Sequence, residues 1–217
     1  MKPLAIATAL IATLALGGCA QEIAVEPTPT PTATPTPTPT PEPVAERLVV
    51  GSDAMTVIAD NGETLATYDY FQDPQGVVVE LTDLFGFAPS VKQIQPYEGI
   101  PYLESDWSGF RILDLDRETD GVLYSSYWVE ITAATISAIT VETVEGIAVG
   151  DDAEPVERAH PETTEHITPP NTGIPRYLID VDILPLPSGY TFSVSLSGEV
   201  GSPIERIFAP AGGGPSI

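Results

Sequence analysis

The sequence predicts an α+β fold, in which antiparallel sheet carries one short helix in each of two tandem repeats. Segments rich in β-branched and aromatic residues recur from Leu48 onward, and two segments carry helix caps. The same order of elements also occurs twice. The repeats would occupy residues 48–135 and 136–209, which together form a folded region over 48–209.

The first half is expected to begin with a strand at 48–50 and a hairpin over 55–71. Asp60-Asn61-Gly62 has the composition of a hairpin turn. A helix should follow, because Asp73 can cap it and Gly86 can end it. Pro74 suits the first helical position, and an apolar face is formed by Val77, Val78, Leu81, Leu84 and Phe85. Strands are then expected at 90–94, 109–116 and 125–133.

The second half is expected to repeat this order, with a strand at 136–143 and a short helix within 150–162. Asp152 can cap this helix, and Glu154 can pair with Arg158 one turn later. Three further strands are expected at 176–184, 190–198 and 202–210. Residues 210–217 are rich in glycine and are expected to form a disordered tail.

The N-terminus has the pattern of a secretory signal peptide. Lys2 precedes an apolar run from Leu4 to Leu16, and the small residues Gly17 and Gly18 follow. The run of 13 residues is shorter than the roughly 20 that a membrane-spanning helix needs. Residues 1–18 are therefore predicted to be a signal peptide.

The four residues Leu16-Gly17-Gly18-Cys19 resemble the lipobox of bacterial lipoproteins. This resemblance implies that Cys19 receives a diacylglyceryl group and becomes the mature N-terminus. Two acyl chains anchor a protein stably, whereas one holds it only marginally. The alternative is a secreted protein with a free thiol at its cleavage site, which is a liability in an oxidising compartment.

Residues 19–47 are predicted to form a lipid anchor followed by a disordered linker. Pro27 to Pro43 contains eight prolines and seven threonines. Proline fixes φ and lacks an amide donor, so helix and sheet are excluded here. A polyproline II spacer of this length would reach roughly 50 Å. Its composition also suits O-glycosylation, although an unmodified tether would serve equally well.

The composition is strongly acidic. Removal of residues 1–18 takes away Lys2 and leaves seven basic and 31 acidic residues, a net charge of −24. Phosphate backbones and anionic lipid headgroups would repel such a surface, so nucleic acid is excluded as a partner. With Cys19 used for lipid, no thiol remains for a disulfide or a nucleophile. Nothing in the sequence implies a cofactor.

A second resemblance covers Val141 to Glu162, "VETVEGIAVGDDAEPVERAHPE". This segment resembles a motif of uncharacterised actinobacterial lipoproteins, in which a GIAVGDD turn leads into a short helix. The strand "SPIERIFAP" near the end is similar to their last strand. The repeated order of helix and sheet is more distantly similar to β-lactamase-inhibitor-protein-like and SmpA/OmlA-type lipoprotein domains. That similarity implies a binding or assembly module.

Three kinds of catalytic or metal site are poorly matched by the sequence. No G-x-S-x-G nucleophile motif occurs. A calcium loop beginning at Asp116 would place Tyr127 where a bidentate glutamate is needed. A zinc set is conceivable among residues 160–166, but this spacing of histidines is not a recurring one and a polar loop is expected there. The zinc candidates are His160, Glu162, Glu165 and His166.

Aromatic residues are concentrated between residues 97 and 128, where seven of the 16 aromatics occur. In "SYWVEIT" the side chains alternate, so Tyr127 and Trp128 should face opposite sides of a sheet. One side is core. The other is expected to contribute, with a long loop, to a binding surface made of Tyr97, Tyr102, Trp107 and Tyr127.

Taken together, the sequence predicts a non-catalytic binding or scaffolding domain on a Pro/Thr stalk. It would be lipid-anchored through Cys19 on the extracytoplasmic face of the cell membrane. Its partner would be another envelope protein or a cell-wall component. The alternative is an envelope hydrolase or a metal-dependent enzyme that uses the acidic loops.

Overall fold

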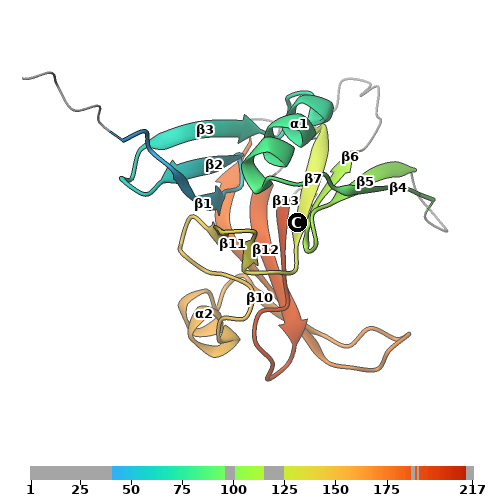
Figure 1. Cartoon of the computed structure of the whole chain (residues 1–217). Coiled ribbons are helices and arrows are strands. Elements are labelled where there is room, and N and C mark those ends of the chain that lie inside the picture. Colours follow the sequence, from blue (N-terminus) through green and yellow to red (C-terminus); the bar gives the residue numbers. More distant parts are fainter. Residues whose placement is uncertain (1–40, 96–100, 115–124, 187–188, 190, 214–217) are drawn as a thin grey trace, which may run out of the picture. The chain divides into compact units, whose positions relative to one another are not determined.

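Figure 1 shows the computed structural model of the chain, which describes residues 41–95, 101–114, 125–186, 189 and 191–213. Within these residues the chain forms two short helices and two sheets, which confirms the predicted α+β class. The helices are α1 (Pro74–Phe85) and α2 (Ala153–Ala159).

The first sheet has five strands in the order β3-β2-β1-β9-β8. It is mixed, because β1 and β9 pair in parallel, whereas the other neighbouring strands of the sheet pair antiparallel. Its strands are β1 (Ala45–Val50), β2 (Ala54–Ala59), β3 (Thr64–Asp69), β8 (Thr135–Ile136) and β9 (Ile139–Thr143).

The second sheet has eight strands in the order β10-β11-β12-β13-β7-β6-β5-β4, and every neighbouring pair is antiparallel. Its first four strands in chain order are β4 (Ser90–Ile94), β5 (Tyr102–Asp106), β6 (Phe110–Asp114) and β7 (Tyr127–Ile131). The others are β10 (Thr164–Ile167), β11 (Arg176–Pro185), β12 (Thr191–Glu199) and β13 (Arg206–Gly213).

Both sheets combine strands from the two halves that the sequence analysis treated as repeats. In the first sheet β9 lies beside β1, and in the second β13 lies beside β7. Neither predicted half therefore forms a sheet of its own. The folded region also extends beyond the predicted limits of 48–209, since β1 begins at Ala45 and β13 ends at Gly213.

The caps of α1 are those predicted. The Asp73 carboxylate accepts hydrogen bonds from the amides of Gln75 and Gly76, and Pro74 occupies the first turn. Gly86 ends the helix with φ of 77°, a left-handed conformation that glycine adopts without strain. The second helix begins after Asp152, which accepts a hydrogen bond from Glu154 N.

Two strands lie where the sequence analysis expected loops. The segment containing Tyr102 forms β5, which pairs with β4 on one side and β6 on the other. The polar segment after α2 contains β10, which pairs only with β11. An edge strand pairs on one side only and tolerates polar, exposed side chains, so its sequence resembles that of a loop.

The buried side chains of both sheets and of α1 form one core. Phe85 of α1 contacts Trp107 and Phe110, with ring centroids 5.8 and 5.4 Å apart. Figure 1 shows α1 close to β6. The opposite face of the eight-stranded sheet is the outer face, and it carries the side chains that alternate with the core residues along each strand.

Candidate functional site

The expected aromatic surface is changed by the structure. Trp107 and Tyr127 have no exposed surface, so neither side chain can contact a partner. Trp107 follows β5 in a tight hairpin and packs against α1, and Tyr127 packs against Tyr70 with ring centroids 5.5 Å apart. Tyr102 lies partly exposed in β5, and Tyr97 lies outside the described residues.

Alternation along β7 places Trp128, rather than Tyr127, on the outer face, which confirms that the two side chains point in opposite directions. Trp128 contacts Phe208 of β13, with ring centroids 5.6 Å apart. Both rings are partly exposed. The aromatic contribution to the outer face therefore comes from this pair.

The register of the eight-stranded sheet aligns one row of side chains across six strands of the outer face. Each member is the direct cross-strand partner of the next. In order from β11 to β5 the row is Asp180, Ser195, Phe208, Glu130, Arg111 and Asp106.

The outer face is low along β12, because this strand carries small side chains there. Ser193, Ser195 and Ser197 occupy alternate positions and point outward, while Val194 and Leu196 are buried in the core. Because serine is small, the taller side chains of the neighbouring strands rise on both sides of β12. A hollow of about 460 Å³ lies over β11 and β12, and a second of about 340 Å³ adjoins it over β12 and β13.

The two hollows share four lining residues, Leu178, Ser195, Ala211 and Gly212, and together they are called the groove. The first hollow is otherwise lined by Glu162, Thr163, Glu165, Asp180, Ile183, Thr191 and Ser193. The second is otherwise lined by Ser197, Arg206 and Phe208.

Asp180 is a carboxyl group of the groove with a perturbed pKa. Burial raises its pKa above the ordinary carboxyl value, and the nearby charge of Glu165 acts in the same direction. Hydrogen bonds from the hydroxyl groups of Ser195 and Ser193 partly offset the effect of burial. The backbone at Asp180 is fixed by Thr163, whose hydroxyl group donates a 2.6 Å hydrogen bond to the Asp180 carbonyl oxygen.

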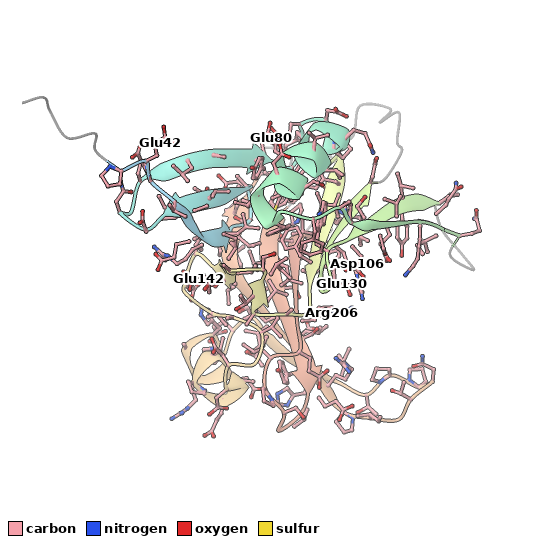
Figure 2. All side chains as sticks on the ribbon, viewed as in Figure 1. Glu42, Glu80, Asp106, Glu130, Glu142 and Arg206 are labelled. Carbon is pink, nitrogen blue, oxygen red and sulfur yellow. The ribbon has the colours of Figure 1, made fainter. Side chains whose placement is uncertain are left out.

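Ion pairs hold the side chains beside the groove. Arg206 donates from Nε to the Ser197 hydroxyl oxygen at 3.2 Å, and its Nη1 lies 3.9 Å from Glu130. Glu130 also accepts a 2.8 Å hydrogen bond from Arg111, which lies 3.5 Å from Asp106. Figure 2 shows Asp106, Glu130 and Arg206 close together on the strands of this sheet.

Every basic side chain in the described part of the chain forms an ion pair of this kind. Besides the two arginines above, the paired residues are Arg47, Lys92, Arg158 and Arg176, which contact Glu142, Glu104, Glu154 and Glu205. The excess carboxylates of the described surface are therefore not balanced by any described free cation. Glu162, Glu165 and Asp180 in the groove belong to this excess.

The histidines contact two different glutamates. His160 Nε2 lies 2.9 Å from Glu145, and His166 Nε2 lies 3.5 Å from Glu157 of α2. The described residues hold no group of three or more histidine, cysteine, aspartate or glutamate side chains arranged for a metal ion. The calcium loop that would begin at Asp116 lies outside the described residues up to residue 124.

The lipidation residue Cys19 and the linker also lie outside the described residues. Within the described part, no helix is long and apolar enough to cross a membrane. Comparison with known proteins adds no relative. No protein-family model matches this chain, and neither a curated protein nor a solved structure matches it.

Sequence reasoning missed the groove, although one signal for it was present. The segment "FSVSLSG" alternates serine with apolar residues, so one face of this strand must be a row of hydroxyl groups. Asp180, Arg206 and Phe208 had no such signal. They join Ser195 and Ser197 only through the pairing of β11 and β13 with β12.

The perturbed carboxyl group gives a stability prediction. Because the pKa of Asp180 is raised in the fold, folding favours its protonated form. The contribution of Asp180 to the free energy of unfolding is therefore most favourable in acid. This contribution is lost as the pH rises through the raised pKa of Asp180. Asp180→Asn cannot ionise, and it should raise the melting temperature by about 1–3 °C at neutral pH. Partial exposure of the carboxyl group limits the gain.

Thermal unfolding of the wild type and of Asp180→Asn at several pH values checks this prediction. The difference should vanish below the ordinary carboxyl pKa of about 4, where Asp180 is protonated in both states. Asp83→Asn, on the exposed side of α1, is the matched control and should leave the melting temperature unchanged. A neutral-pH melting temperature of Asp180→Asn below that of the wild type would contradict the assignment.

Proposed function

We propose that this protein is a lipid-anchored binding protein on the extracytoplasmic face of the cell membrane, and that the groove takes its ligand from the cell wall. The observation that carries the proposal is the groove itself. Hydroxyl groups, a carboxyl group with a raised pKa and apolar side chains converge there on the surface of a sheet. Polar groups that converge in a surface hollow, together with a perturbed pKa, are typical of binding sites.

Placement on a sheet supports this proposal. The lining side chains of β11, β12 and β13 are fixed by ladder hydrogen bonds and by the core beneath them. A rigid sheet presents its side chains without the entropy cost of ordering a loop. The raised pKa of Asp180 means that folding disfavours its ionised form, and such a cost is expected where a residue is kept for function.

The proposed lipid anchor and spacer favour a ligand in the cell wall. A diacylglyceryl group on Cys19 and a spacer of roughly 50 Å would place the folded region beyond the membrane surface, within reach of wall material. The net charge of the mature chain would keep it away from anionic headgroups. A stalked binding domain of this kind suits a ligand that lies at a distance from the bilayer.

A sedimentation experiment tests the proposal. The mature chain carrying Cys19→Ser, which cannot be lipidated, is mixed with insoluble cell-wall material and centrifuged. We expect the chain to sediment with the wall. Ser195→Trp should reduce the bound fraction at least tenfold, because an indole at the junction of the two hollows would obstruct both.

Thr67→Trp is the matched control. Thr67 lies exposed on β3, so the same substitution there leaves the groove open. Equal sedimentation of the two variants would reject the groove as the binding site. If the Cys19→Ser chain with an unchanged groove stays in the supernatant, the proposed function is rejected.

A glycoside hydrolase is the second candidate. Asp180 has a raised pKa, and Glu165, which lines the same hollow, contributes to that shift. Two carboxyl groups in different environments can serve as acid and base in sugar hydrolysis. Release of reducing sugar ends from wall material by the wild type, but not by Asp180→Asn, would establish this activity in place of simple binding.

A further inference from the structure

The chemistry of the groove also limits the class of ligand, provided that the groove is the binding site proposed above. Its two hollows have volumes of about 460 and 340 Å³ and share Ser195 at their junction. Sites for small organic ligands fall in the range of about 300–1,000 Å³. The groove thus lies over β11, β12 and β13 and has the volume of a site for a small organic ligand.

Apolar side chains flank the hydroxyl row of the groove on both sides. Leu178 and Phe208 lie on opposite sides of β12, as the cross-strand partners of Ser197 and Ser195. Both side chains are partly exposed, and Trp128 extends the apolar surface beyond Phe208. Ala211 and Gly212 leave the surface low on this side. A ligand with an apolar face can therefore lie against these side chains.

The polar groups of the groove lie beside these apolar side chains. Asp180 is directly opposite Ser195, so a carboxylate acceptor adjoins a hydroxyl group that both donates and accepts. Ser193 and Ser197 flank Ser195 at intervals of two residues and line the hollows, but both are buried, and the Ser197 hydroxyl already accepts from Arg206. Vicinal hydroxyl groups of a ligand would find an acceptor and a donor side by side. Hydrogen bonds to a carboxylate are the stronger kind.

The charge of the groove excludes acidic ligands. Glu162, Glu165 and Asp180 line one hollow, and Arg206 is the basic residue of the lining. Arg206 contacts Glu130 at 3.9 Å and donates to Ser197, and its single positive charge is outnumbered by the three carboxyl groups of the lining. An acid group on the ligand would meet three like charges in a partly desolvated hollow.

From these observations we infer that the groove binds an oligosaccharide without acid groups. The apolar face of each sugar ring would lie on Leu178 and Phe208, and its hydroxyl groups would bond to Asp180 and Ser195. Sugars combine an apolar ring face with vicinal hydroxyl groups at its rim, and both complements are present here. The inference rests on the proposed function, and it adds the ligand class.

Calorimetric titration of the mature Cys19→Ser chain tests the inference. The neutral probes are the tetrasaccharides of N-acetylglucosamine, glucose (α- and β-linked), mannose and galactose, and the acidic probe is tetragalacturonate. We expect at least one neutral probe to bind and tetragalacturonate to bind at least tenfold more weakly. Asp180→Asn and Phe208→Ala should each weaken the neutral probe about tenfold.

Two exposed positions supply the controls. Asp83→Asn on α1 and Phe87→Ala after it should bind the neutral probe as the wild type does. Circular dichroism of each variant separates a loss of binding from a loss of fold. The neutral probe should also displace the chain from wall material.

The outcomes separate the inference from the function on which it rests. If wall sedimentation remains sensitive to Ser195→Trp but no neutral probe binds, the function stands and the ligand class is wrong. Tetragalacturonate binding as tightly as the neutral probes would also overturn the inference. Failure of wall sedimentation itself would remove both.

Discussion

Trp107→Ala is expected to lower the free energy of unfolding by about 3–5 kcal/mol, the loss typical of removing a large buried aromatic side chain. Trp107 has no exposed surface, and its ring contacts Phe85 and Phe110 at centroid distances of 5.8 and 6.2 Å. Truncation to alanine would leave a cavity where α1 meets the eight-stranded sheet. Urea unfolding followed by far-UV circular dichroism measures the change.

Two further substitutions make this result specific. Within the described part of the chain, Trp107 Nε1 has no hydrogen-bond partner, so its indole N–H adds a cost rather than a benefit. Trp107→Phe keeps most of the ring contacts and should cost less than about 1.5 kcal/mol. Trp128→Ala removes a partly exposed indole that contacts Phe208 and should cost only about 1 kcal/mol. An unchanged unfolding midpoint for Trp107→Ala would contradict its place in the core.

Cys19→Ala is expected to move the full-length protein from the membrane fraction to the soluble fraction. Cys19 is the sole cysteine of the chain, and it stands at the end of the Leu16-Gly17-Gly18-Cys19 motif. Two acyl chains give stable attachment, and the acidic surface provides no electrostatic substitute for them. Removal of the acceptor sulfur should therefore abolish membrane attachment rather than weaken it.

Fractionation of cells that express the variant gives the first measurement, and mass spectrometry of the N-terminal peptide gives the second. Gln21→Ala, two residues beyond the acceptor, is the control and should remain lipidated and in the membrane. Retention of Cys19→Ala in the membrane fraction would show that another segment attaches the protein. An unmodified Cys19 peptide from wild-type membranes would have the same meaning.

The parts of the fold that were predicted correctly depend on local chemistry. Asp73, Pro74 and Gly86 define α1 because a helix is begun and ended by its own residues. The turn at Asp60-Asn61-Gly62 likewise joins β2 and β3 as expected, and Gly62 adopts φ of 84°. In each case the determining residues lie within a few positions of the element.

Other features were set by residues distant in the sequence. The burial of Trp107 depends on Phe85, which lies 22 positions earlier and on another element. The segment of β5 shows little alternation of its own, and it becomes a strand because β4 and β6 flank it. Neither fact could be read from the segment itself, because tertiary pairing overrides weak local preference.

The candidate site likewise combines a feature visible in the local sequence with features set by distant residues. The serine row of β12 was visible as a period of two in "FSVSLSG". Its partners were not, because the register of β11 and β13 decides which of their side chains lie beside it. A shift by one residue would place Ile179 and Ile207 on that face instead of Asp180 and Phe208.

The parallel pairing of β1 with β9 also has a consequence for the order of folding. Arg47 contacts Glu142 across this pair, although 95 positions separate them in the chain. The hairpins of β1, β2 and β3 can form early, but one edge of β1 stays open until β9 has been synthesised. Contacts so distant in sequence slow folding, and an open edge invites pairing with other chains. The newly made chain thus keeps an unpaired edge on β1 until residues 139–143 can reach it, and the acidic charge of its surface opposes association with other chains during that interval.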